Sequence, residues 1–499
     1  MSRAVIVGGG FGGIAAALRA RAMGYSVTIV DRCQRLGGRA QLFEHGGYRH
    51  DAGPTVITAP FLIKELFELF GYRAEDFINI VPLSPWYRFQ YADGNTFDYG
   101  GSMQQTLAEI KRIAPGDVDG YQRMLDHSRA IHDVGFSKLA HTPFHNFSFM
   151  LQQVPALVRL GAYRTVWGFV SQYLKSDKLR QAFSIQPLLV GGNPFDTTSI
   201  YALIHFLERA HGVHFIMGGT AALVDGLADL CRRVGIVTCL GETVTGIETA
   251  AGAVSGVVTD TGRRLPAEVV ISNADPAHVY PKLLKSNEVS AAAKLKVALH
   301  RKSMGLFVLY FGTTRQYPDV AHHTIWLGHR YQALLNDIFN KKILPDDFSL
   351  YLHRPTATDP SFAPPGHDSF YVLAPVPNLE GGVDWPVQAP LLRDRIINAL
   401  DQTILPGLKN CIAAPFHMTP EDFAHDYLSP AGAGFSISPS FRQSAWFRFH
   451  NRGEGPRGLY LVGAGTHPGA GLPGVISSAK VVEGLLPPAQ SAAIPSQAA

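Results

Sequence analysis

The feature that most constrains the fold is a glycine-rich loop between a strand and a helix near the start of the chain. The run "VGGGFGG" places Gly8, Gly10 and Gly13 at the spacing of a dinucleotide-binding fingerprint. Apolar residues 3–7 predict a strand before the loop, and the alanine-rich stretch 12–23 predicts a helix after it. Gly8 permits the tight turn, Gly10 lets a pyrophosphate approach the backbone, and Gly13 lets the helix pack on the strand. The phosphates would lie at the positive end of the helix.

An acidic residue completes this first unit. Residues 26–30 predict a second strand, which Asp31 closes eighteen positions after Gly13, where a carboxylate can bind ribose hydroxyls. The order strand, helix, strand predicts a parallel α/β domain that binds a nucleotide. A second loop, "LLVGGNPF" (188–195), lacks the third glycine and has Pro194 where a helix should start, so we interpret it as a structural turn.

Composition narrows the classes of partner and compartment. A chain of 499 residues with 46% hydrophobic residues can form two or three domains. Its formal charge of +4, from 44 basic and 40 acidic residues, does not favour a nucleic-acid partner. Four cysteines without paired spacing favour a reducing compartment. The sequence shows no signal peptide and no long apolar stretch, so we expect a cytoplasmic protein without a membrane-spanning helix.

The segment 134–176 has an unusual composition. It contains no Asp or Glu, and its basic residues are interleaved with eight aromatic ones. An anionic membrane surface attracts such a segment, whereas a helical subdomain with an aromatic core would have the same composition. Both interpretations remain open from the residues alone.

Longer motifs carry a family resemblance. "RLGGRA" (35–40) and "HDAGPTVI" (50–57) follow the first unit as they do in the flavin-dependent amine oxidase superfamily. Together with "AHHTIWLGHRY", "DDFSLYLHRP", "FYVLAPVP", "QSAWFRFHNR" and "LYLVGAGTHPGAGLPGV" (459–475), they resemble the bacterial-type phytoene desaturases, the carotenoid desaturase branch of that superfamily. The resemblance covers nearly the whole chain.

The resemblance implies an α/β fold. It consists of a Rossmann-like FAD-binding domain assembled from discontinuous segments, an α+β substrate domain and a helical membrane-facing region. The expected boundaries are 1–110, 215–280 and 431–486 for the FAD-binding domain, 111–214 for the helical substrate and membrane-facing region, 281–430 for the substrate domain, and 487–499 for a disordered tail.

The resemblance also implies FAD as the cofactor and a set of residues that contact it. The first glycine stretch would hold the phosphates, and the second, with a helix starting at Gly474, would lie beside the flavin ring. The implied cofactor-binding residues are Gly8, Gly10, Gly13, Asp31, Gly38, Arg39, Gly53, Pro54, Thr55, Val244, Gly463, Gly465, Pro473, Gly474 and Val475.

The implied activity is repeated desaturation of phytoene to a conjugated carotene such as neurosporene or lycopene, by hydride transfer to flavin and loss of a proton. Expected partners are a hydrophobic polyene, a membrane surface, and quinone or oxygen as electron acceptor. The implied location is cytoplasmic and peripherally membrane-associated. Three alternatives stay open: a related desaturase or isomerase for another polyene, an amine oxidase, and a non-catalytic prenyl-lipid escort protein.

The proton acceptor is not identified by the sequence. Asp346, Asp347, Asp359 and His467 lie in family-like stretches and are candidates, although each is better interpreted as a loop, cap or turn residue. Relatives carry an Asp and an Arg three residues apart in the region where this chain has Phe149 and Gln152.

No metal site is predicted. Pro143 lies between His141 and His145, and His322 and His323 would point to opposite faces of a strand.

Overall fold

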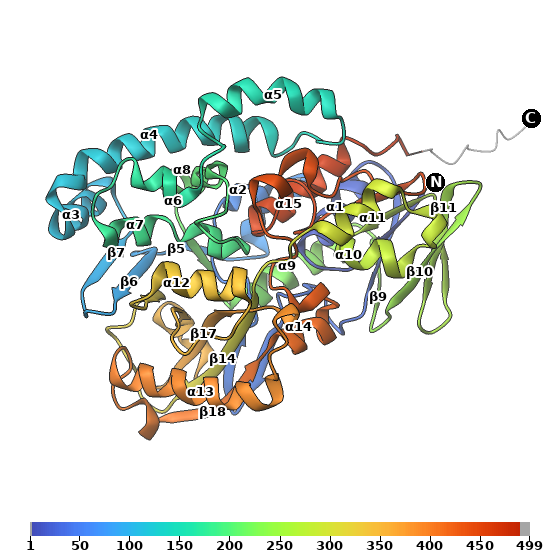
Figure 1. Cartoon of the computed structure of the whole chain (residues 1–499). Coiled ribbons are helices and arrows are strands. Elements are labelled where there is room, and N and C mark those ends of the chain that lie inside the picture. The colour runs from blue at the N-terminus through green and yellow to red at the C-terminus, as the bar shows by residue number, and fades with distance from the viewer. Residues whose placement is uncertain (1, 490–499) are drawn as a thin grey trace, which may run out of the picture.

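The structure, a computed structural model that describes residues 2–489, is built around two large sheets (Figure 1). The first sheet has five strands, all parallel, and contains the strand that precedes the glycine loop. In spatial order they are β19 (Leu459–Leu461), β13 (Val269–Ser272), β1 (Arg3–Val7), β2 (Ser26–Asp31) and β9 (Val237–Leu240). Three separate parts of the chain therefore form one sheet, and β13, which lies in the segment 215–280, pairs with β1.

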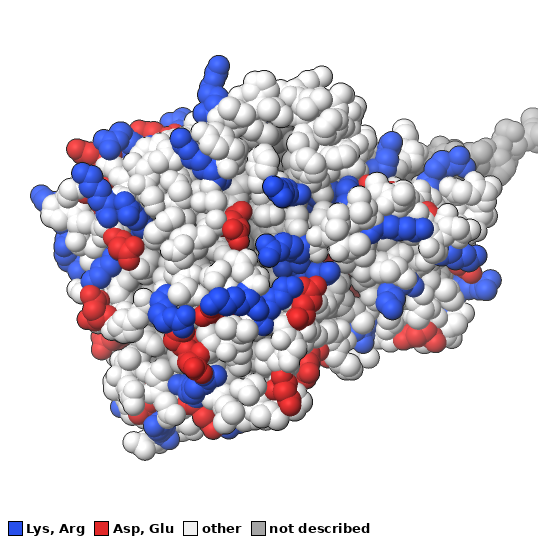
Figure 2. Space-filling model, viewed as in Figure 1, with Lys and Arg blue, Asp and Glu red and all other residues white. Residues whose placement is uncertain are grey.

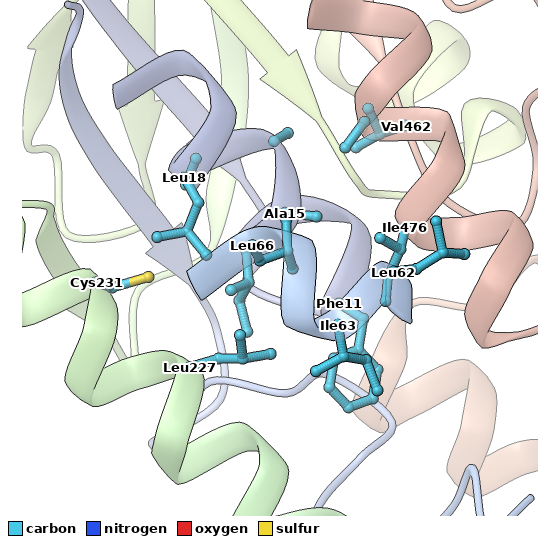
Figure 3. Close-up of a cluster of buried hydrophobic side chains, with 14 of the residues drawn as sticks. Phe11, Ala15, Leu18, Leu62, Ile63, Leu66, Leu227, Cys231, Val462 and Ile476 are labelled. Carbon is cyan, nitrogen blue, oxygen red and sulfur yellow. The ribbon is translucent and has the colours of Figure 1, made fainter. Parts of the chain in front are cut away.

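Four helices cover this sheet around an apolar core. They are α1 (Phe11–Ala22), α2 (Pro60–Glu68), α9 (Gly219–Arg233) and α15 (Leu472–Glu483). Figure 3 shows the cluster between them, with Phe11, Ala15 and Leu18 from α1, Leu62, Ile63 and Leu66 from α2, Leu227 and Cys231 from α9, and Ile476 from α15. Full burial of one such leucine contributes about 1.5–3 kcal/mol relative to exposure.

A buried arginine of α1 links this helix to α2 and α15. Arg19 of α1 is 2% exposed and forms ion pairs with Glu65 of α2 at 3.0 Å and with Glu483 of α15 at 2.7 Å. Two carboxylates compensate the cost of burying one guanidinium. The pairs fix α2 and α15 against α1.

The second sheet has seven mostly antiparallel strands. Their spatial order is β18 (Ile412–Met418), β14 (Gly305–Thr313), β17 (Asp368–Val376), β16 (Leu350–His353), β15 (His323–Leu327), β6 (Tyr87–Tyr91) and β7 (Thr96–Tyr99). The strands β6 and β7 fall inside the expected first FAD segment, 1–110, yet they belong to this sheet because β6 pairs with β15. That segment therefore contributes to both sheets.

Helices dominate the region expected as 111–214. They are α3 (Met103–Ile113), α4 (Val118–Val134), α5 (Phe147–Arg159), α6 (Val166–Ser171), α7 (Asp177–Phe183) and α8 (Leu203–His211). Figure 1 shows α5 along the upper edge of the molecule. The segment 134–176, with its many aromatic residues, contains both buried and exposed parts. Phe136, Phe144 and Phe169 are buried, whereas α5 has no buried residue.

The remaining elements complete the two halves. Strands β10 (Val244–Ala250), β11 (Ala253–Thr259) and β12 (Arg264–Pro266) form an antiparallel sheet. Two smaller antiparallel sheets pair β3 (Leu42–His45) with β4 (Tyr48–Asp51) and β5 (Ile80–Pro82) with β8 (His214–Ile216). The other helices are α10 (Pro276–His278), α11 (Ala291–Leu299), α12 (Tyr331–Asn336), α13 (Trp385–Gln402) and α14 (Pro420–Tyr427).

Most of the predicted disordered tail, 487–499, lies outside the described residues. Of the three positions that are described, Pro487 accepts a hydrogen bond through its carbonyl oxygen from the Tyr25 hydroxyl at 2.5 Å. The start of the tail is thus attached to the five-stranded sheet.

Candidate functional site

Two cavities meet between the sheets. The first, which we call the glycine-loop cavity, has a volume of about 330 Å³ and lies beyond the carboxyl ends of β1 and β2, where ligands bind in parallel α/β sheets. The second, which we call the apolar cavity, has a volume of about 410 Å³ and is lined by α5, α8 and strands of the seven-stranded sheet. Both are lined by Pro54, Leu189, Tyr371, Leu373, Phe435, Ala470, Gly471 and Leu472. A group bound in one cavity can therefore reach the other across this shared wall.

The glycine loop exposes bare backbone to the first cavity. Gly8 has φ +94°, in the left-handed region that favours glycine, and both Gly8 and Gly10 line the cavity. A Cβ on Gly10 would lie 2.8 Å from Nδ2 of Asn273. Gly13 lies beneath the loop, and a Cβ on it would be 1.9 Å from the Gly8 oxygen, so α1 can approach the loop this closely only with glycine at this position. The loop fits a diphosphate at the start of α1.

Asp31 is held at the edge of the same cavity. Its carboxylate accepts a hydrogen bond from the Gly9 N–H at 2.5 Å and another from the Cys33 N–H at 2.7 Å. Burial raises the pKa of Asp31, while these two N–H groups lower it. The carboxylate is thus oriented toward the cavity, at the place expected for a ribose contact.

Arg39 is a half-buried cation that lines the glycine-loop cavity. Its guanidinium donates to the Gly434 carbonyl at 2.7 Å and to the Ser429 hydroxyl at 2.6 Å, and among the described residues it forms no ion pair. Desolvation lowers the pKa of Arg39, and the charge of Asp275 offsets part of this effect. A diphosphate would supply a directly bound counterion, so the residues present fit the predicted cofactor.

The second glycine stretch forms the shared wall. Helix α15 begins at Leu472, two residues before the predicted Gly474, and Gly471 precedes it with φ +90°. A Cβ on Gly474 would lie 2.6 Å from the Gly469 carbonyl oxygen. Pro473 and Gly474 line the apolar cavity, whereas Val475 lines the glycine-loop cavity. The start of α15 therefore separates the two spaces.

The other predicted cofactor residues are distributed around this wall. Gly38, Gly53, Val244 and Gly465 line the glycine-loop cavity, Thr55 lines the apolar cavity, and Pro54 lines both. Gly463 lines neither: it has φ +97°, and its Cβ would lie 2.6 Å from Oδ1 of Asn273.

The aspartates considered as proton acceptors lie elsewhere. Asp346 is exposed and pairs with Arg395 at 3.3 Å, and Asp347 pairs with Arg330 at 2.9 Å. Asp359 caps a short helix and accepts from the Gly218 N–H at 2.7 Å. None of the three lines either cavity. Ion pairing and capping account for them.

His467 does line the apolar cavity, but its ring is engaged. Its Nε2 lies 2.8 Å from the Leu139 carbonyl oxygen, and burial lowers the pKa of His467 to about 4. This geometry matches the loop-shaping hydrogen bond that the sequence favoured.

Sequence reasoning missed Glu208. This residue of α8 is 1% exposed and lines the apolar cavity. Its Oε1 accepts from the Tyr87 hydroxyl at 2.8 Å, its Oε2 has no partner, and burial raises the pKa of Glu208 to about 7. The available signal was its position four residues after Ile204, in a region expected to be helical, where an acidic residue would share a face with apolar ones.

The prediction for "AHHT" was wrong in its geometry. Strand β15 begins at His323, so His322 precedes the strand and does not follow its alternation. The two rings lie 4.6 Å apart between centroids, and His353 of β16 joins them.

Comparisons with known proteins agree with this geometry. A family described as flavin containing amine oxidoreductase matches residues 11–482. The chain belongs to this family. It is an FAD-dependent oxidoreductase, with a cavity whose residues fit that cofactor.

Two curated relatives are similar over nearly their full length. The chain is 45% identical to a lycopene-forming phytoene desaturase of Pantoea ananas, over 97% of this chain and 99% of that protein. It is 42% identical to a neurosporene-forming phytoene desaturase of Rhodobacter capsulatus, over 100% of this chain and 96% of that protein.

A solved oxidoreductase from Methanosarcina mazei has a similar fold, with a TM-score of 0.66 and 17% identity over 96% of this chain and 99% of that chain. In the described part of the chain, no helix is both long and apolar enough to cross a bilayer.

Proposed function

We propose that the chain desaturates phytoene in carotenoid biosynthesis, with FAD as cofactor, in repeated rounds that give neurosporene or lycopene. One observation carries the proposal: a large apolar cavity shares a wall with the cavity that fits the nucleotide. The activities of the two relatives support the choice of substrate. A shorter or oxygenated polyene is the alternative, because an apolar cavity recognises length and shape more than polar groups.

The reaction removes a hydride and a proton from neighbouring carbon atoms and leaves a double bond. Bound FAD supplies the acceptor for the hydride. The apolar walls hold the polyene and exclude water. The positive end of α15, where Gly471 and Leu472 line both cavities, favours negative charge at the shared wall. Quinone or oxygen is the proposed final electron acceptor.

Glu208 is the proposed proton acceptor. Among the described residues that line the apolar cavity, it is the one carboxylate. Its Oε2 is free to accept, while the hydrogen bond from Tyr87 holds Oε1. A pKa of about 7 leaves a substantial ionised fraction near neutral pH and makes the group a suitable base.

Helix α5 is the proposed contact with the membrane. Phe147, Leu151 and Val158 are 46–55% exposed and recur at helical spacing. Figure 2 shows a mostly uncharged surface over α5, with basic side chains at its edges and no acidic ones. Met150, Val154, Leu157 and Val158 of the same helix also line the apolar cavity, so a polyene can pass from a bilayer beside α5 into the cavity.

This arrangement supports a cytoplasmic enzyme that is attached peripherally to the membrane. A long hydrocarbon stays in the bilayer, since each methylene gains about 0.8 kcal/mol on leaving water. The enzyme must therefore meet its substrate at that surface.

The test is reconstitution with phytoene. Flavin-loaded protein is incubated with liposomes that contain phytoene and a quinone, and the products are separated by chromatography. Conversion to neurosporene or lycopene supports the proposal. Unchanged phytoene, together with conversion of a shorter or oxygenated polyene in a parallel reaction, would favour the alternative.

A further inference from the structure

Three buried histidines form a cluster outside both cavities. His322, His323 and His353 are 6%, 0% and 0% exposed, and none of them lines either cavity. His323 and His353 lie directly opposite each other in the register of β15 and β16. The centroids of the three rings are 4.6–5.4 Å apart. The fold thus brings together imidazoles from two strands.

The nitrogen atoms that face this cluster lack partners. Nδ1 of His322 bonds to the Thr358 hydroxyl at 2.7 Å, and Nδ1 of His323 bonds to the Tyr351 hydroxyl at 2.8 Å. Nε2 of both residues and both ring nitrogens of His353 are buried with no hydrogen-bond partner. One nitrogen from each ring lies within 4.8 Å of the other two. A buried polar atom without a partner costs about 1–3 kcal/mol, so several together indicate a bound group.

A carboxylate borders the cluster. Asp51, at the end of β4, is 1% exposed, and its Oδ2 lies 3.7 Å from Nε2 of His353 without a hydrogen bond. Its other oxygen, Oδ1, accepts from the Thr220 N–H of α9 at 2.9 Å. Asp51 therefore places a carboxyl group at the edge of the cluster, next to His353.

The outer hydrogen bonds of two of these rings also match a metal site. For His322 and His323, Nδ1 is hydrogen-bonded to a hydroxyl, which leaves Nε2 available to a metal. Metal-binding histidines show this pattern of outer hydrogen bonds.

We propose that His322, His323, His353 and Asp51 bind one divalent transition-metal ion of the zinc class. Three imidazoles and one carboxylate suit Zn²⁺ in a closed tetrahedral site. Zn–N bonds of about 2.0–2.1 Å place neighbouring ligand atoms about 3.4 Å apart, so the side chains close in slightly around the ion.

The proposed ion would connect the two large sheets of the molecule. It would join β15 and β16 of the seven-stranded sheet to β4, which Asp51 attaches to α9 beside the five-stranded sheet. It would also fix Tyr351, which lines the apolar cavity and lies 2.6 Å from the Thr55 hydroxyl. The site has four protein ligands and no open position, so its role is structural.

The test measures metal in the full chain, prepared without a histidine tag, by mass spectrometry. We expect about one equivalent of zinc per flavin-loaded chain, retained in His205→Gln and reduced at least tenfold in His353→Gln and His323→Gln. His205 is a matched control, because it is also fully buried with both ring nitrogens unpartnered. Equal zinc content in wild type and His353→Gln, with both folded, overturns the proposal and leaves a trapped water as the occupant.

Cobalt provides a second measurement that does not need a folded variant. Wild-type protein treated with chelator is titrated with Co²⁺, and d–d absorption that saturates at one equivalent supports a tetrahedral site. Absence of those bands overturns the proposal. Neither readout depends on the desaturation reaction, so failure here is distinct from failure of the proposed function.

Discussion

At the scale of single residues, the main consequence of the fold is the environment that it gives to Glu208. Desolvation disfavours the carboxylate, and the Tyr87 hydroxyl offsets part of this effect. The group is therefore mostly protonated below pH 7 and mostly ionised above it.

Replacement of Glu208 should impair proton removal. We expect Glu208→Gln to lower the rate of desaturation by about 10²–10⁴-fold, the range typical for loss of a general base. Wild-type activity should rise as the pH increases through about 7, because ionised Glu208 is the active form. The variant should lose this rise. Assays of phytoene turnover in liposomes between pH 5.5 and 8.5 provide the measurement.

A stability measurement separates this effect from misfolding. The pKa of Glu208 is raised from 4.5 in the unfolded chain to about 7 in the folded one. Its contribution to stability is complete below the unfolded value and is lost as the pH rises through 7. Glu208→Gln should thus gain resistance to urea relative to wild type above pH 7. A variant that is less stable at pH 8 would contradict this account.

Residue-level prediction is possible where the local sequence determines the geometry. Gly8, Gly10 and Gly13 follow from spacing alone, because a turn and a helix start impose it. Glu208 could not be chosen among 40 acidic residues, since its burial depends on Tyr87, which is 121 positions away.

At the scale of elements, the start of α15 combines packing with function. Gly474 lies in the first turn of α15, against the backbone of Gly469, which belongs to the tight turn before the helix. Both residues line the apolar cavity. Backbone cannot move aside as a flexible side chain can.

Substitution at this turn should displace the wall. We expect Gly474→Glu to abolish desaturation and to reduce flavin retention, because even its Cβ would lie 2.6 Å from the Gly469 oxygen. Flavin absorbance per chain after gel filtration is the readout. Gly116→Glu is the matched control, since that glycine is exposed and a Cβ added to it would have no atom within 4 Å. Full flavin content in Gly474→Glu would refute the placement.

The exposed face of α5 permits a separate prediction. Leu151→Asp combined with Val158→Asp should weaken binding to anionic vesicles at least tenfold, because each change replaces apolar contact of about 1.5–3 kcal/mol with a charge that anionic lipids repel. Co-sedimentation with vesicles measures the effect.

The control places the same change on another helix. Leu391 of α13 is 53% exposed, and Leu391→Asp should leave vesicle binding unchanged. Equal loss of binding in both proteins would exclude α5 as the specific contact.

At the scale of the whole molecule, the glycine-loop cavity collects residues from both sheets. Val7 and Asp31 come from the five-stranded sheet, whereas Leu306 and Tyr371 come from the seven-stranded sheet. A ligand there stabilises the assembly of the halves.

Removal of FAD should therefore reduce global stability. A ligand at 100 times its dissociation constant adds about 2.7 kcal/mol to the free energy of unfolding. We expect FAD to raise the Tm by a few degrees in differential scanning fluorimetry, and NAD at the same concentration to raise it less. Equal shifts with both nucleotides would contradict the assignment of the cavity.

Elements that follow one another in the chain were the easiest to predict, whereas pairing between distant segments was anticipated only in part. The unit β1–α1–β2 followed from its glycines and apolar runs. The assignment of β6 and β7 to the FAD-binding segment did not anticipate their sheet, because β6 pairs with β15, more than 230 positions downstream. The histidine cluster was not predicted for the same reason, because His353 comes from another strand.

The pairing of β19 with β13 and the packing of α15 on α1 have a consequence for synthesis. The fingerprint leaves the ribosome first, yet the sheet and the wall beside it are complete only after residues 459–483 have emerged. Through most of translation, the glycine-loop cavity of the nascent chain is therefore incomplete and its apolar cavity is open. The complete cofactor site therefore forms only after the segment 459–483 has been synthesised, and until then the exposed apolar surface favours aggregation.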